Sequence, residues 1–149
     1  MSHHEATLSW SRGGRGMGYE EYPRDHTWGF DGGPEVAATA APDFKGNPGR
    51  VDPEEAFVAA VASCHMLTFL AIASRKRLVV DRYDDEATGF MEKNADGKLA
   101  ITKVVLRPVV RFGGAKALTD KELEHLHHQA HENCFIANSV RTEIEVMPA

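Results

Sequence analysis

The chain has 149 residues, which is enough for one domain with a single hydrophobic core. Its hydrophobic content of 42% and its charged content of 26% are ordinary for a soluble globular protein. The formal net charge is −5, and lysine and arginine form no dense cluster. This composition argues against a nucleic-acid-binding protein, because contacts to phosphates require a basic surface. We expect a single domain over residues 1–149.

The N-terminal stretch MSHHEATLSW lacks the basic start and the apolar run of a signal peptide. Cys64 and Cys134 are the two cysteines, and a pair this far apart in the sequence does not suggest a secreted disulfide framework. We therefore expect a cytoplasmic protein, in which a bond between the two thiols would be transient rather than structural.

The N-terminal third of the chain predicts a small antiparallel sheet. Apolar and polar residues alternate over 5–11, which predicts a half-buried strand. RDHTWGF (24–30) predicts a second strand, DGG (31–33) a tight turn, and EVAATAA (35–41) the returning strand. The next stretch, PDFKGNPGR (42–50), is predicted to be a loop.

A long helix is predicted from Asp52 to about Arg77. Asp52 can cap the free backbone N–H groups, Pro53 suits the first helical position, and Glu55 is placed to close a capping box. Residues 56–74 carry no charge over 19 positions, near the length that spans a bilayer. Polar residues cluster at the centre of this stretch, where lipid would penalise them. We therefore expect a central helix buried by its own protein and no association with a membrane.

The second half of the chain is predicted to contain further strands and a second helix. Segments 78–93 and 98–112 predict strands joined by a turn at NADGK. LTDKELEHLHHQAHENC (118–134) predicts a helix with a threonine N-cap, and alternation over 140–146 predicts a last strand. This order of elements predicts an α+β fold with a mainly antiparallel sheet.

Cys64 lies about a dozen residues into the predicted long helix, where the helix dipole no longer acts on its thiol. Burial among apolar side chains would raise the pKa of this thiol, and only the thiolate is a good nucleophile. A reactive Cys64 therefore needs a cation from elsewhere in the fold, because His65 points about 100° away around the helix. Cys64 could also be a small core residue without chemistry, and Cys134 shares this ambiguity.

Three stretches of the sequence together resemble one known family. PEEAFVAAVASCHM (53–66) resembles the helix motif of the OsmC/Ohr peroxide reductases, and HENCFIANSV (131–140) resembles their second cysteine segment. YPRDHTWGFDGG (22–33) resembles the front hairpin of OsmC-like members. The resemblance covers nearly the whole chain in the right order. It implies an OsmC-like fold, with antiparallel sheets around a long central helix, in an intertwined homodimer whose active sites are shared between subunits.

The resemblance also implies a set of catalytic residues and a reaction. Cys64 is similar to the peroxidatic cysteine and Cys134 to the resolving one. Arg24 is similar to the arginine that holds the thiolate, and Glu54 to the glutamate that orients this arginine. The implied protein is a thiol-dependent peroxidase without cofactor or metal, which reduces organic hydroperoxides to alcohols through a Cys64 sulfenic acid and a Cys64–Cys134 disulfide. An external dithiol would then reduce the disulfide.

The spacing of the implied residues sets a geometric condition. Glu54 and Cys64 are ten residues apart, about 15 Å along an ideal helix, so they cannot touch within one straight helix. We expect either that Arg24 bridges much of this gap or that Glu54 comes from the other subunit. Tyr22 and His26 flank Arg24 in the sequence and could line its pocket.

Other interpretations of the same residues stay open. Four histidines of the predicted second helix could bind a metal, but a solvated helix face explains them better because no known metal-binding frame is present: His125, His127, His128 and His131. A Cys–His hydrolase would need an oxyanion hole near a helix start, whereas Cys64 is predicted in mid-helix. The main alternative is a non-catalytic OsmC-fold protein that binds a small apolar ligand.

Overall fold

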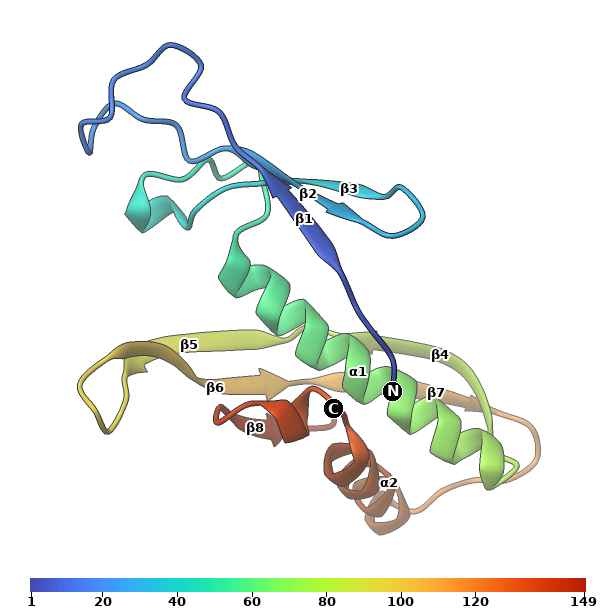
Figure 1. Ribbon diagram of the computed structural model, residues 1–149. Helices are drawn as coiled ribbons and strands as arrows, with labels where there is room; N and C mark the ends of the chain where they lie inside the picture. The colour runs from blue at the N-terminus through green and yellow to red at the C-terminus, as the bar shows by residue number, and fades with distance from the viewer. The chain divides into compact units, whose positions relative to one another are not determined.

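The structure is a computed structural model that describes all residues from Met1 to Ala149. The chain divides into two compact units, Met1–Ala56 and Phe57–Ala149. Strands and helices follow one another in the order that the sequence predicts. The α+β class, with antiparallel sheets and one long helix, is confirmed (Figure 1). The single domain expected over residues 1–149 stays a prediction.

The first unit is built on a three-stranded antiparallel sheet in the order β1-β2-β3. The central strand pairs on both sides, with Leu8 opposite Trp28 on one edge and Val36 opposite Trp28 on the other. The tight turn before the third strand places Gly32 and Gly33 at positive φ, which glycine adopts without a Cβ clash. The strands span β1 Ala6–Ser9, β2 His26–Phe30 and β3 Glu35–Ala38.

The strand β1 forms where the sequence predicts it, but its expected half-burial is wrong. All four of its residues are exposed, and Leu8 keeps 71% of its surface. Alternation fixes which side chains share a face, and β1 is an edge strand whose apolar face no element of the first unit covers.

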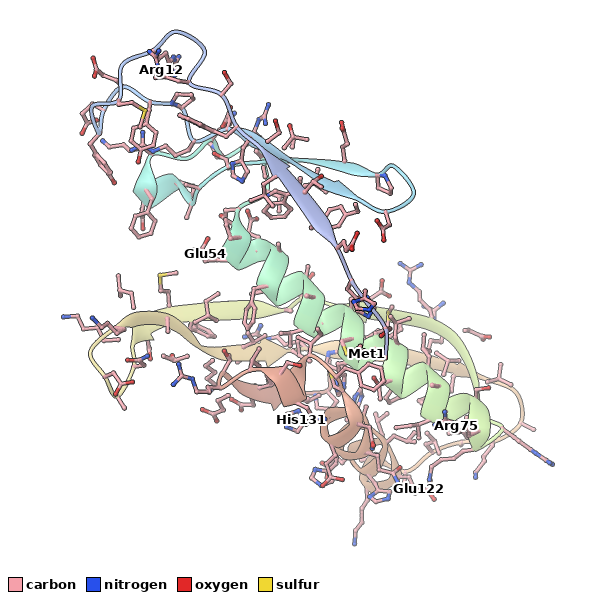
Figure 2. All side chains as sticks on the ribbon, in the orientation of Figure 1. Met1, Arg12, Glu54, Arg75, Glu122 and His131 are labelled. Carbon is pink, nitrogen blue, oxygen red and sulfur yellow. The ribbon has the colours of Figure 1, made fainter.

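The long helix α1 (Pro53–Arg75) begins with the predicted capping box. The backbone N–H of Glu55 donates to Oδ1 of Asp52 at 2.8 Å, and the N–H of Asp52 donates to Oε1 of Glu55 at 3.2 Å. The helix ends two residues before the predicted position because Arg77 takes a left-handed conformation with φ 60°. Figure 2 labels Glu54 in the first turn and Arg75 in the last.

Only one stripe of α1 is buried in this chain. It consists of residues four apart, Val61, His65, Phe69 and Ala73. The face of α1 that carries Leu67 is exposed, and Leu67 keeps 60% of its surface. By length and composition alone α1 could cross a membrane, and 22% of its most apolar window is buried. Within the second unit the remaining faces of α1 are uncovered, and the expectation of a helix buried by its own protein stays a prediction.

The second unit contains a long, bent hairpin (Figure 1). Each predicted strand is split into two, so that β4 pairs with β7 and β5 pairs with β6 around the turn at residues 94–98. The split lies at Arg107, whose N–H donates to Oδ1 of Asp85 at 2.7 Å while its guanidinium donates to Thr88 at 3.0 Å. The bounds are β4 Val79–Asp85, β5 Thr88–Lys93, β6 Leu99–Leu106 and β7 Pro108–Gly113.

The remaining elements complete two hydrophobic clusters on α1. The last strand β8 (Glu143–Val146) pairs in parallel with β6, and α2 (Asp120–Asn133) begins with the predicted cap at Thr119. One cluster joins Phe69 and Ala73 of α1 to Leu126 and Ala130 of α2. The other joins Val61 of α1 to Val104 and Leu106 of β6. These contacts fix α1 and α2 beside one another in the second unit.

Candidate active site

The two cysteines, seventy positions apart in sequence, meet in the second unit. Cys64 lies half-buried in mid-α1, and Cys134 lies buried directly after α2, with 1% of its surface exposed. Both are free thiols, and the Cys134 side chain acts on the pKa of Cys64. The two helices that carry them are held together by the cluster of Phe69 and Leu126, so the sulfur pair is positioned by the core.

The pKa of the Cys64 thiol is lowered, although its partial burial acts to raise it. The opposing causes are hydrogen bonds that favour the thiolate, from the Cys134 thiol, from the backbone N–H groups of Ile136 and Phe135, and from the Thr68 hydroxyl. Burial thus acts on this pKa in the expected direction, and the hydrogen bonds together outweigh it. The segment after α2 supplies donors to the sulfur, and these lower the pKa without a cation.

Thr68 lies within reach of two acceptors on the same residue. Its hydroxyl donates to the backbone carbonyl of Cys64 at 2.8 Å, and it can also donate to the sulfur. A hydroxyl carries one proton, so it serves one acceptor at a time. The hydroxyl can thus turn to the sulfur when Cys64 ionises.

Cys134 differs from Cys64 in the direction of its pKa shift. Burial, the hydrogen bond to Cys64 and the charge of an ionised Cys64 raise the pKa of Cys134 to about 11. Cys134 therefore stays protonated while Cys64 ionises. The pair combines one thiol poised as a nucleophile with one poised as a donor.

A cavity of about 610 Å³ opens beside Cys64. It runs along the exposed face of α1 to Arg75 in the last turn of the helix, and Asn133 and Phe135 close it on the other side. Most of its other walls are small or apolar side chains, namely Ala60, Ser63, Leu67, Thr68, Ala71 and Ile72. The site offers an apolar cavity with a single reactive group, the Cys64 sulfur.

The side chain of His65 turns away from the sulfur pair. Its Nε2 atom lies 3.0 Å from Nδ1 of His127, and the two rings stack with centroids 5.3 Å apart. The Cys64 thiol has no histidine partner, which removes the geometry of a Cys–His hydrolase.

The expectation of a solvated histidine face on α2 is wrong for His127. This side chain keeps 2% of its surface, because it lies on the same stripe as Leu123 and Ala130, which face the core. His125 and His128 are exposed as expected, and no three His, Cys, Asp or Glu side chains come together in a metal-binding arrangement.

Arg24 lies in the loop before β2 of the first unit. Its guanidinium donates to the carbonyls of Tyr22 at 2.5 Å and Tyr19 at 2.7 Å. It also stacks over both rings, 3.6 Å from the centroid of Tyr22 and 4.7 Å from that of Tyr19. Arg24 makes no ion pair, so its positive charge is held by carbonyls and aromatic rings alone.

Glu54 lines the same cavity of about 370 Å³ as Arg24, together with Tyr22 and His26. The Oε2 atom of Glu54 is buried and has no hydrogen-bond partner. The implied pair thus shares one cavity, although no ion pair between Arg24 and Glu54 has formed in this arrangement. A buried carboxylate oxygen without a partner is costly, which favours a conformation in which Glu54 finds a donor.

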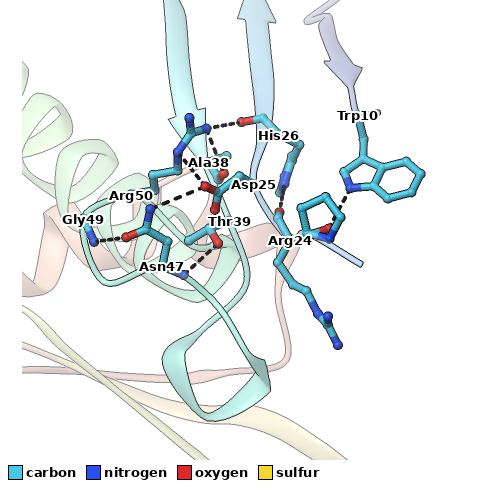
Figure 3. A network of polar contacts seen from close by, with 10 residues as sticks. Trp10, Arg24, Asp25, His26, Ala38, Thr39, Asn47, Gly49 and Arg50 are labelled. Carbon is cyan, nitrogen blue, oxygen red and sulfur yellow. Dashed lines mark hydrogen bonds and ion pairs between the residues drawn. The ribbon is translucent and has the colours of Figure 1, made fainter. Parts of the chain in front are cut away.

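The stretch from Pro23 to His26 is fixed by side chains from two other parts of the first unit (Figure 3). Trp10 Nε1 donates to the carbonyl of Pro23 at 2.8 Å. Arg50 donates to the carbonyl of His26 at 3.1 Å and pairs with Asp25 at 3.3 Å. Sequence reasoning missed Arg50, because nothing local to its NPGR stretch points to Asp25.

The comparisons with known proteins agree with the architecture. Residues 46–148 match the family described as OsmC: OsmC-like protein. The chain is similar to an OsmC-like protein of unknown function from Vibrio cholerae O1 biovar eltor, with 49% identity over 100% of both chains and a TM-score of 0.96. No curated protein matches.

More distant structures share the fold. An organic hydroperoxide resistance protein from Elizabethkingia anophelis, with thiocyanate bound, has a TM-score of 0.73 and 19% identity over 99% of this chain and 94% of that one. The organic hydroperoxide resistance protein OhrB of Bacillus subtilis has a TM-score of 0.67 and 17% identity over 99% and 98% of the two chains. With most of the chain matched by the family and its whole length by the Vibrio protein, this chain belongs to the OsmC-like family.

Proposed function

We propose that the protein is a thiol peroxidase that reduces organic hydroperoxides in the cytoplasm. The observation that carries the proposal is the pair of free thiols in the second unit, in which the pKa of Cys64 is lowered and that of Cys134 is raised. The fold shared with organic hydroperoxide resistance proteins is consistent with this chemistry. An apolar cavity next to the lower-pKa thiol provides a place for the substrate.

The first step consumes the peroxide. The Cys64 thiolate attacks the distal oxygen of ROOH, the O–O bond breaks, and the alkoxide leaves and takes up a proton to become the alcohol ROH. Cys64 is oxidised to the sulfenic acid, and the peroxide is reduced by two electrons. The donors from Ile136 and Phe135 favour the ionised sulfur that this step requires.

The second step resolves the sulfenic acid. The sulfur of Cys134 attacks the sulfur of Cys64, a disulfide forms, and the hydroxyl leaves as water with the proton of the Cys134 thiol. The mutual effect of the two thiols on their pKa values supports this pairing. An external dithiol then returns both cysteines to thiols and leaves as its own disulfide.

Arg24 and Glu54 would act on the peroxide and the thiolate. A guanidinium stays charged at any working pH and offers donors in a fixed fork, which suits the two oxygens of a hydroperoxide. The unpartnered Oε2 of Glu54, in the cavity that Arg24 also lines, supports its assignment as the group that orients Arg24. We assign both residues to the active site on this basis.

The proposal includes a homodimer with shared active sites. The exposed stripe of α1 is an uncharged surface of small and apolar residues, and its neighbour Phe135 keeps 81% of its surface. Exposed apolar area of this kind is typical of an interface. A second copy of the chain would cover it and turn the open cavity into an enclosed site.

The substrate class follows from the walls of the Cys64 cavity. Leu67, Ile72 and Phe135 offer apolar surface to the organic group of a hydroperoxide, and hydrogen peroxide has no group to use it. We therefore expect a preference for fatty or aromatic hydroperoxides.

Turnover with cumene hydroperoxide tests the function. Reduced protein with dithiothreitol should consume the peroxide catalytically, and Cys64→Ser should abolish this activity while His125→Ser, an exposed position on α2, leaves it intact. If the wild type binds the compound without consuming it and both thiols persist, the protein is instead a non-catalytic binder of small apolar molecules.

A further inference from the structure

We propose that His26 is a positioning residue for Arg24, and that its imidazole holds the arginine where the peroxide reaction needs it. The inference rests on the proposed function, because it assigns a role within the same site. It starts from two hydrogen bonds that fix both nitrogens of the His26 ring. Figure 3 shows the first of these, to the carbonyl of Arg24.

The partners of His26 define the tautomer. Nδ1 lies 2.7 Å from the carbonyl oxygen of Arg24, which can only accept, so Nδ1 carries the proton. Nε2 lies 3.0 Å from Nε1 of Trp28, which can only donate, so Nε2 accepts. The result is a neutral imidazole whose orientation is set by the indole of Trp28 on β2, and the rings of His26 and Trp28 lie 6.1 Å apart between centroids.

The bond to Arg24 is made with its backbone rather than its guanidinium. By accepting from His26, the Arg24 carbonyl sets the plane of the peptide that follows the arginine. Arg50 holds the carbonyl of His26 at 3.1 Å, so the peptide after Arg24 and the peptide after His26 are both fixed. With the backbone fixed, the side chain of Arg24 starts from a defined point in the cavity that it lines together with His26 and Glu54.

This arrangement separates what is fixed from what can move. The backbone of Arg24 is held by His26, while its guanidinium is held by carbonyls and aromatic rings that it can exchange for other partners. A small displacement of a charged group away from the reacting atoms is enough to cost rate. The effect of His26 on the reaction should therefore be transmitted entirely through Arg24.

Three substitutions test the two hydrogen bonds separately. His26→Leu removes both, and it should lower the second-order rate constant for oxidation of Cys64 by cumene hydroperoxide by about tenfold, the equivalent of one strong hydrogen bond. His26→Asn keeps an N–H near the position of Nδ1 and should restore most of the rate. Trp28→Phe removes only the donor to Nε2 and should have an intermediate effect. His125→Leu, on the exposed face of α2, is the matched control and should leave the rate unchanged.

A double-mutant cycle with Arg24 distinguishes positioning from a general effect on the fold. In the Arg24→Ala background, His26→Leu should have no further effect on the rate constant, which stays measurable because any thiolate reacts slowly with peroxide. A His26→Leu protein with unchanged rate, or one whose loss is equally large with and without Arg24, overturns the inference. An Arg24→Ala protein with the full rate also overturns the inference. If Cys64→Ser consumes cumene hydroperoxide as fast as the wild type does, the proposed function fails instead, and the two failures are thus distinguishable.

Discussion

The imidazoles of His65 and His127 stack in the core of the second unit, nearly parallel at 8° and linked by a contact of 3.0 Å between Nε2 and Nδ1. One ring belongs to α1, next to Cys64 in sequence, and the other to α2, which Cys134 directly follows. Both rings are almost fully buried. The helices that carry the two thiols are thus joined by a pair of neutral histidines.

This pair predicts a loss of stability in acid. Burial, with the charges of His127 and His131, lowers the pKa of His65 to about 4, and burial lowers that of His127 to about 4, against 6.5 for a free histidine. Between these values the unfolded chain binds protons that the folded chain does not. The stabilisation is complete above pH 6.5 and is lost as the pH falls toward 4, by about 1.4 kcal/mol per pH unit for each proton.

Urea unfolding between pH 7 and pH 4 measures this slope. In the His127→Leu variant, the unfolding free energy should depend less steeply on pH, by the contribution of about one proton. This holds whatever the stability of the variant at pH 7. The His125→Leu variant, changed at an exposed position, should keep the slope of the wild type. Parallel pH profiles for wild type and His127→Leu would show that the pair does not titrate in this way.

Removing the Cys134 thiol should change the acidity of Cys64. Cys134→Ala deletes a donor to the Cys64 sulfur and should raise the pKa of Cys64, whereas Cys134→Ser keeps a donor and should change it less. The rate of alkylation by iodoacetamide as a function of pH reports this pKa. Equal profiles for the two variants would contradict a role for the hydrogen bond.

The apolar cavity should determine the choice of peroxide. Leu67→Asn should lower kcat/KM for cumene hydroperoxide by about fivefold, as expected for about 1 kcal/mol of lost apolar contact, and should leave the value for hydrogen peroxide unchanged. Leu99→Asn is the control, because Leu99 is as exposed as Leu67 but lies on β6 outside the cavity. An equal loss for both peroxides would show that the cavity does not hold the organic group.

The N-cap of α2 should contribute measurably to stability. Thr119 accepts from the N–H of Glu122 at 3.1 Å, and the Glu122 carboxylate accepts from the N–H of Thr119 at 3.0 Å. Thr119→Ala should cost about 1 kcal/mol of unfolding free energy, and Thr119→Ser should restore most of it. A Thr119→Ala variant as stable as wild type in urea would show that the cap is dispensable.

Local features of the fold could be predicted from the sequence. Three local features depend only on residues within four positions of one another: the capping boxes at Asp52 and Thr119 and the turn at Gly32. They can therefore be predicted without knowledge of the tertiary structure. The burial of His127 also had a signal, since it lies three and four positions from core residues on one helical stripe.

Properties that depend on distant residues could not be predicted in this way. The donors that lower the pKa of Cys64 come from Phe135 and Ile136, which the sequence places far from it. The exposure of β1 was missed for a related reason. A pattern of apolar residues shows which side chains share a face, and it does not show whether another element covers that face.

The central claim is that Cys64 reduces a hydroperoxide and Cys134 resolves the product. The most direct measurement treats reduced protein with one equivalent of cumene hydroperoxide, without reductant, and analyses thiols, alcohol and peptides together. We predict one alcohol formed for each two thiols lost, with a Cys64–Cys134 disulfide found by mass spectrometry, and a stable sulfenic acid on Cys64 in Cys134→Ser. Peroxide that survives in the presence of both free thiols would contradict the account.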